Sequence, residues 1–217
     1  MGQSSFASSL HERVREYYTD KFRQFGATPR GADWRDSESQ ELRFARLLDV
    51  FEDRSAMSLI ELGCGYGALC SYLRRAGWNV EYTGYDLAEE MVTAARQALH
   101  GEQRVHFEIG SRPETTADYC VASGIFNVRF DIDDADWTEY VFETLDIMAS
   151  SSRRGFAFNF LTRFSDRDRM EARLFYADPG EMLDRCIERF GRRVSLAHGY
   201  GLFEFTMLVW HGAGSQR

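Results

Sequence analysis

The chain has 217 residues, of which 44% are hydrophobic and 28% are charged, so it is long enough for one α/β domain and too short for two ordinary enzyme domains. Its formal charge of −8 argues against a protein that grips a nucleic-acid backbone, which usually presents a basic face. The four cysteines show no metal-ligand spacing, and neither an apolar leader nor a membrane-length apolar run is present, so we expect a cytoplasmic protein with no metal site and no membrane partner.

Two helices are predicted at the N-terminus. Apolar residues recur at helical spacing from Phe6 to Phe25, and Gly26 follows them as glycine often follows a helix. After a polar, turn-rich stretch, Ser37 and Gln40 resemble the capping box of a second helix. Because both helices precede the first predicted strand, we expect residues 1–55 to form a helical cap or lid over a domain that spans residues 56–212.

Strands and helices then alternate along the chain, which favours a doubly wound, Rossmann-like α/β fold with a parallel sheet. No helix separates the last two strands, so these two are expected to pair antiparallel. The seven predicted strands are Met57–Leu62, Val80–Tyr85, Val105–Ile109, Asp118–Ala122, Gly155–Phe160, Val194–Ala197 and Phe203–Trp210. The helices between them are predicted near Ala68–Ala76, Ala88–Leu99 and Asp136–Ala149, with a further helix opening at Pro179.

A glycine-rich turn follows the first strand, with the sequence ELGCGYG from Glu61 to Gly67. Glycine lets a ligand approach the backbone closely and permits positive φ, whereas a Cβ would obstruct the approach. A tight strand-to-helix turn without a ligand would also explain these glycines. The second strand ends in Asp86, where adenosine-binding folds place an acidic residue that accepts hydrogen bonds from the ribose hydroxyls. Asp86 is also placed to cap the next helix.

Together, ELGCGYG and GYDLAEEMV resemble motif I and the following acidic motif of the class I S-adenosylmethionine-dependent methyltransferases. The third glycine comes two residues after the second, which differs from the GxGxxG of dinucleotide binders. The resemblance covers residues 57–210 and is clearest over 57–127. It implies S-adenosylmethionine as cofactor, with the following residues beside it: Glu61 near the amino end, Gly63, Cys64, Gly65 and Gly67 beneath the methionine, Asp86 on the ribose, and Leu87 and Met91 beside the adenine.

The ends of the third and fourth strands add further candidates. The third strand leads to Gly110 and Ser111, where many family members carry an acidic residue for the adenine amino group. The fourth leads to Ser123 and Gly124, which the resemblance places at the cofactor and substrate, and to Phe126 and Asn127 as substrate-binding residues. This strand lacks the Asp/Asn-Pro-Pro-Tyr/Phe motif, which argues against amino-directed nucleic-acid and protein-glutamine substrates.

The predicted lid supplies candidates for both ligands. Arg43 and Gln40 lie on the helix that enters the first strand and are candidates for the methionine carboxylate. Trp34 lies in a turn, where it is either a substrate contact or a hydrophobic plug. Tyr18 is either a substrate contact or part of the packed face of its helix.

Acceptor chemistry is expected at the carboxyl ends of the later strands, because ligands bind there in such sheets. Asn159 is a candidate for substrate binding, and Tyr176 and Asp178 could orient or deprotonate the acceptor, although Asp178 also suits the cap of the helix at Pro179. His198 lies in the last turn, where it is a candidate base or a surface residue.

These observations predict a methyltransferase that acts on an oxygen or nitrogen atom of a small metabolite, as a monomer or a homodimer. Three alternatives stay open: a methyltransferase for RNA or protein, an enzyme that uses the same cofactor without methylation, and a non-catalytic cofactor-binding subunit. The glycine spacing disfavours a dinucleotide-dependent oxidoreductase.

Overall fold

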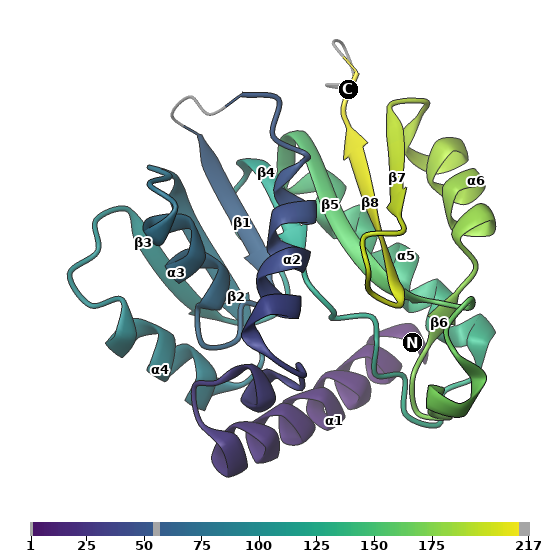
Figure 1. Ribbon diagram of the computed structural model, residues 1–217, viewed down its shortest axis with the longest axis horizontal. Coiled ribbons are helices and arrows are strands. Elements are labelled where there is room, and N and C mark those ends of the chain that lie inside the picture. Colours follow the sequence, from purple (N-terminus) through teal and green to yellow (C-terminus); the bar gives the residue numbers. More distant parts are fainter. Residues whose placement is uncertain (1, 54–56, 213–217) are drawn as a thin grey trace.

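A computed structural model describes residues 2–53 and 57–212 of the chain. A mixed sheet forms its centre, in the order β3-β2-β1-β4-β5-β8-β7, with a short β6 paired to β5 (Figure 1). The strands are β1 Ser58–Leu62, β2 Glu81–Asp86, β3 Val105–Ile109, β4 Ala117–Ala122, β5 Ser152–Thr162, β6 Tyr176–Ala177, β7 Val194–His198 and β8 Glu204–Trp210.

The predicted α/β architecture is confirmed, including the antiparallel last pair. Strands β1 to β5 pair parallel, whereas β8 runs antiparallel to both β5 and β7. The sheet exceeds the predicted seven strands by β6, whose two residues are too few to produce a periodic pattern. His198 closes strand β7 and so precedes the turn in which it was predicted.

Helices cover both faces of the sheet, as a doubly wound fold requires. On one face α2, α3 and α4 pack against β1, β2 and β4, and on the other α5 and α6 pack against β4, β5 and β8. The helices are α1 Gly2–Phe25, α2 Ser37–Leu48, α3 Ala68–Arg75, α4 Glu89–Ala98, α5 Asp134–Ser150 and α6 Pro179–Phe190, with the 3-10 turns η1 Pro29–Ala32 and η2 Arg167–Arg169. No helix in this part of the chain is both long and apolar enough to cross a membrane.

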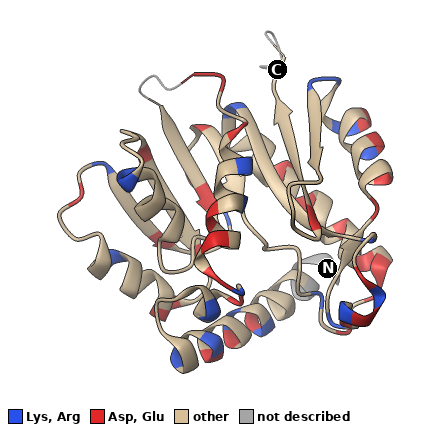
Figure 2. Cartoon of the chain, viewed as in Figure 1, with Lys and Arg blue, Asp and Glu red and all other residues tan. Residues whose placement is uncertain are grey.

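Helix α1 lies across the edge of the sheet where the parallel strands end (Figure 1). Its Leu10 is 2% exposed and packs in the same core as β4, β5 and α5. Near its other end, Arg23 pairs with Glu90 of α4. Acidic and basic residues alternate along this helix (Figure 2). The N-terminal segment therefore packs on the edge where ligands bind in open α/β sheets.

Candidate functional site

A pocket lies between α1 and the loops that follow β1, β2, β3 and β4. Helix α5 and the turn η1 complete its wall. Many of its lining residues come from the glycine turn, the acidic motif and the two later strand ends: Leu62, Gly63, Gly65, Asp86, Leu87, Met91, Gly110, Ser111, Ser123, Gly124 and Ile125. The remaining lining residues are Ala7, His11, Val14, Tyr18, Ala32, Trp34, Tyr140, Glu143, Thr144 and Ile147.

The turn after β1 needs glycine for two reasons. Gly63 has φ +71°, and a Cβ on it would lie 2.3 Å from Cγ2 of Ile125. Its N–H donates to the carbonyl of Tyr85 at 2.8 Å, which fixes the turn against the end of β2. Gly67 ends the turn at φ +81° as the N-cap of α3 and does not line the pocket. Any side chain at Gly63 would therefore be strained at this φ and would collide with Ile125, so the turn requires glycine here.

Asp86 links the glycine turn to the start of α4. Its Oδ2 accepts from the N–H of Gly65 and its Oδ1 from the N–H of Ala88, each at 2.8 Å. Burial raises the pKa of this carboxyl, and the backbone hydrogen bonds offset part of that rise. Because Asp86 also lines the pocket, its carboxylate is available to a ligand hydroxyl as well as to the turn.

Glu61 lies behind the turn. It is 2% exposed and accepts a hydrogen bond from the phenol of Tyr82. Burial raises the pKa of Glu61 to about 8, against the lowering effect of the Tyr82 hydrogen bond. Cys64 is also buried, and neither side chain lines the pocket. Glu61 was predicted to lie near the cofactor's amino end, but its side chain does not reach the pocket.

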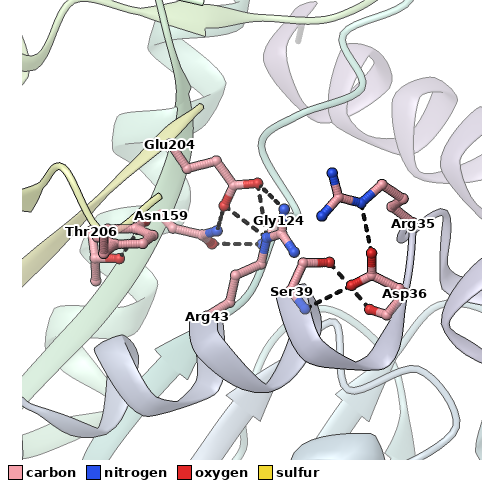
Figure 3. Close-up of polar contacts among 9 residues, drawn as sticks. Arg35, Asp36, Ser39, Arg43, Gly124, Asn159, Glu204 and Thr206 are labelled. Carbon is pink, nitrogen blue, oxygen red and sulfur yellow. Dashed lines mark hydrogen bonds and ion pairs between the residues drawn. The ribbon is translucent and has the colours of Figure 1, made fainter. Parts of the chain in front are cut away.

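Arg43 is buried and paired with Glu204 of β8 (Figure 3). Its Nε donates to both carboxylate oxygens at 2.8 Å, and its guanidinium carbon lies 4.2 Å from the ring centroid of Trp34. Gln40 accepts a hydrogen bond from the phenol of Tyr66 at 3.2 Å. Neither Arg43 nor Gln40 lines the pocket, but Arg43 contacts Trp34, which does.

Glu204 also links Arg43, through Asn159, to the backbone of Gly124, which lines the pocket. Its Oε2 accepts from Nδ2 of Asn159 at 2.6 Å, and Oδ1 of Asn159 accepts from the N–H of Gly124 at 2.8 Å (Figure 3). Sequence reasoning missed Glu204, although one carboxylate within the apolar run of β8 was a usable signal. Asn159 is 1% exposed and positions the Gly124 backbone without lining the pocket.

Four side chains in addition to Asn159 were predicted to bind substrate. Two of them line the pocket and two do not. Trp34 and Tyr18 line the pocket. Phe126 is buried and stacks on Phe160 at 5.1 Å between centroids. Asn127 is 8% exposed and outside the pocket, and its Oδ1 has no partner among the described residues.

Ser123 lines the pocket directly after β4. Its Oγ is buried and makes no hydrogen bond within the part of the chain that the structure describes. A buried hydroxyl without a partner is costly. A ligand atom in the pocket would supply that partner.

The three residues predicted to be catalytic lie outside the pocket. Asp178 caps α6 by accepting from the N–H of Gly180 at 2.8 Å, and it pairs with Arg163. The hydroxyl of Tyr176 accepts from the N–H of Glu171 at 3.0 Å. His198 is exposed on β7, with its ring 6.3 Å from that of Phe164. The structure brings none of them to the residues around Asp86.

Four polar residues that the sequence analysis did not single out line the pocket. His11 comes from α1, whereas Tyr140, Glu143 and Thr144 come from α5. The spacing of Ala7, His11, Val14 and Tyr18 marks one face of a helix and was the available signal for His11.

Parts of the sequence match known methyltransferases. A family model described as a methyltransferase domain matches residues 60–145. A protein of Mycobacterium tuberculosis, named methyltransferase Rv1506c, is 47% identical over 152 residues, which cover 70% of this chain and 92% of that protein. The malonyl-[acyl-carrier protein] O-methyltransferase of Pectobacterium atrosepticum is 34% identical over 85 residues, and the match spans 39% of this chain and only 32% of that enzyme.

Solved structures share the fold at low identity. Magnesium protoporphyrin IX methyltransferase from Synechocystis, with SAH bound, has a TM-score of 0.67 at 15% identity and covers 93% of this chain and 99% of its own. Human N-acetylserotonin methyltransferase, in complex with SAM, has a TM-score of 0.56 at 17% identity over 81% of this chain and 53% of its own.

Proposed function

Because the chain belongs to the class I S-adenosylmethionine-dependent methyltransferases, we propose that it transfers a methyl group from this cofactor to an oxygen or nitrogen atom of a small molecule. The observation that carries the proposal is the convergence of the glycine turn, Asp86 and the unpartnered Ser123 hydroxyl on one pocket.

The residues of the pocket fit the chemistry of the cofactor. Gly63 and Gly65 present bare backbone, and the carboxylate of Asp86 offers acceptors to a ribose diol. Leu87 and Met91 supply apolar surface for an adenine ring. We assign the cofactor to this side of the pocket. When bound, it supplies a methyl group made electrophilic by a sulfonium.

The protein's own contribution is positioning and exclusion of water. Asn159 holds the Gly124 backbone, and Trp34 covers it. Helix α1 closes the pocket over the strand ends. We propose that residues 1–55 act as a lid on a cofactor-binding domain at 56–212.

A small acceptor is supported by the position of α1 over the strand ends, where Ala7, His11, Val14 and Tyr18 line the pocket. The net charge of −8 also disfavours a nucleic-acid acceptor. Two of the compared proteins are named as methyltransferases of small molecules, a porphyrin and N-acetylserotonin.

Calorimetry on the purified chain tests the proposal. We expect micromolar binding of S-adenosylmethionine and S-adenosylhomocysteine, and no binding of NAD, which serves as the control for a dinucleotide site. A screen of small hydroxyl and amine compounds for release of S-adenosylhomocysteine then tests the acceptor class. Binding of NAD alone would refute the cofactor assignment, and release of methylthioadenosine would refute methyl transfer.

A further inference from the structure

One face of α1 lies over the pocket. Ala7, His11, Val14 and Tyr18 occur at positions i, i+4, i+7 and i+11, which places them along one side of a helix, and all four line the cavity. His11 is the only histidine among the described residues that line this pocket. The lid thus carries one group that can accept a proton at neutral pH.

The adjoining wall comes from α5. The rings of His11 and Tyr140 meet edge to face, with centroids 6.0 Å apart. Thr144 and Ile147 continue this wall, and Glu143 lines it as an exposed residue. None of the residues that we assign to the cofactor lies on α1 or α5. The part of the pocket that these two helices line is therefore left for the acceptor.

His11 is suited to act as a base. Burial lowers its pKa below the usual 6.5, so the imidazole is neutral at pH 7. Around it, Glu12 and Arg15 on α1 pair with each other at 3.2 Å. On α5, burial raises the pKa of Tyr140 to about 12, with the charge of Glu143 adding to the rise, so the phenol keeps its proton. The His11 ring makes no hydrogen bond to any described residue, and a ring nitrogen is free for a ligand.

We propose that His11 accepts the proton of a phenolic hydroxyl held between α1 and α5. This inference rests on the proposed methyl transfer and names its acceptor class. The O–H bond breaks and its proton passes to a ring nitrogen of His11. An oxygen lone pair forms the new bond to the methyl carbon, and the C–S electron pair returns to sulfur. The imidazolium then releases its proton to water.

The chemistry of this part of the pocket favours a phenol over an aliphatic alcohol or a carboxylic acid. A base of lowered pKa is poorly matched to an aliphatic alcohol, which holds its proton far more tightly. A carboxylic acid is already ionised at pH 7 and needs no base, and the carboxylates of Glu143 and Asp86 disfavour its approach. Val14, Ile147 and the Tyr140 ring give an apolar wall for an aromatic ring.

The test uses a series of para-substituted phenols, from unsubstituted phenol to 4-nitrophenol, and the matching anilines, with S-adenosylmethionine as methyl donor. We expect methylation of the phenols in preference to the anilines. For unsubstituted phenol, His11→Gln should lower kcat about 100-fold. The loss should shrink for 4-nitrophenol, because that acceptor ionises without help. The acid limb of the kcat–pH profile should disappear in the variant.

Two controls separate this inference from the proposed function. His100→Gln replaces an exposed histidine at the end of α4 and should leave all rates unchanged. Calorimetry on the same samples should give His11→Gln the wild-type affinity for S-adenosylhomocysteine. A wild-type protein that binds no cofactor contradicts the proposed function. A protein that binds cofactor contradicts the His11 inference alone if it methylates no phenol, or if His11→Gln slows every phenol equally.

Discussion

The indole of Trp34 covers Gly124 so closely that a Cβ on Gly124 would lie 2.3 Å from the ring's Cη2 atom. Gly124 also has φ +71°, and its N–H is held by Asn159. The guanidinium of Arg43 lies against the same indole. The turn after η1, helix α2 and the loop after β4 therefore meet at a single contact that only glycine permits.

Gly124→Ala should break this contact. Gly77→Ala is the matched control, because Gly77 has a similar φ of +75° but open space around its Cβ. Alanine is strained at the positive φ of both positions, so the difference between the two losses of stability measures the clash with Trp34. We expect Gly124→Ala to lose about 1–3 kcal/mol more stability than Gly77→Ala in urea unfolding. Equal losses would mean that Trp34 moves aside freely.

The buried pair of Arg43 and Glu204 should be costly to break. Glu204→Gln keeps the shape of the side chain but leaves the Arg43 guanidinium buried without a counter-charge. Removing one partner of a buried pair typically costs about 3–5 kcal/mol. Glu41→Gln, which breaks the exposed pair with Arg75, should cost at most about 1 kcal/mol. Urea unfolding of both variants checks the contrast, and similar costs would show that the buried pair is already solvated.

The pocket wall formed by the ends of β1 to β4 could be predicted because each of its segments directly follows a strand. The glycine turn, Asp86 and the ends of β3 and β4 each follow a strand, and parallel strands bring their ends to one edge. Periodicity also gave the order of strands and helices. Their side-by-side order in the sheet follows from the fold family.

The acceptor side could not be predicted in this way, because its residues meet only through tertiary packing. His11 and Tyr140 on the α1 and α5 wall are separated by 129 positions, and the buried pair of Arg43 and Glu204 behind the pocket is separated by 161. The rule that ligands bind at strand ends favoured Asp178 and Tyr176. In the structure, however, the chain after β5 leads to β6 and α6, and Asp178 is engaged in capping α6.

Asp33→Asn should loosen the lid. Asp33 accepts hydrogen bonds from Tyr17 at 2.6 Å and from Lys21 at 2.7 Å, and Arg173 lies 3.6 Å away. Burial acts to raise the pKa of Asp33, but the Lys21 and Tyr17 hydrogen bonds outweigh it and the pKa is lowered. This carboxylate therefore contributes stability above its ordinary pKa of 3.8, and the contribution is lost as pH falls through the lower folded value.

Hydrogen exchange at pH 7 checks the role of Asp33. Amides of α1 should exchange faster in Asp33→Asn, while those of β1 and β4 keep their protection. Asp131→Asn is the control. Asp131 pairs with Arg13 of α1, but the side chain of Asp131 is 82% exposed. Faster exchange of the α1 amides in Asp131→Asn but not in Asp33→Asn would show that Asp131, and not Asp33, holds α1 in place.

Asp86→Asn should weaken cofactor binding while the chain stays folded. The amide oxygen still accepts one of the two backbone N–H groups, but the charge that would hold the ribose hydroxyls is gone. Hydrogen bonds to a charged group contribute about 1.5–3 kcal/mol, so we expect the Kd for S-adenosylhomocysteine to rise roughly 10-fold to 100-fold. Glu108→Gln, at an exposed carboxylate on β3, should leave the Kd unchanged. An unaltered Kd in Asp86→Asn would refute the ribose assignment.

Glu61→Gln should change how stability depends on pH. The folded pKa of Glu61 is raised from 4.5 to about 8 by burial, so the folded protein holds a proton that the unfolded chain releases. The stabilisation from this proton is complete below pH 4.5 and is lost as pH rises through about 8. Wild-type stability should therefore fall relative to Glu61→Gln across this window, by at most about 1.4 kcal/mol per pH unit. Urea unfolding at pH 5, 6, 7 and 8 without cofactor measures the difference, and Glu81→Gln on exposed β2 surface serves as the control. If the wild-type and Glu61→Gln curves run parallel, Glu61 is ionised in the folded protein and the Tyr82 phenol stabilises a buried carboxylate.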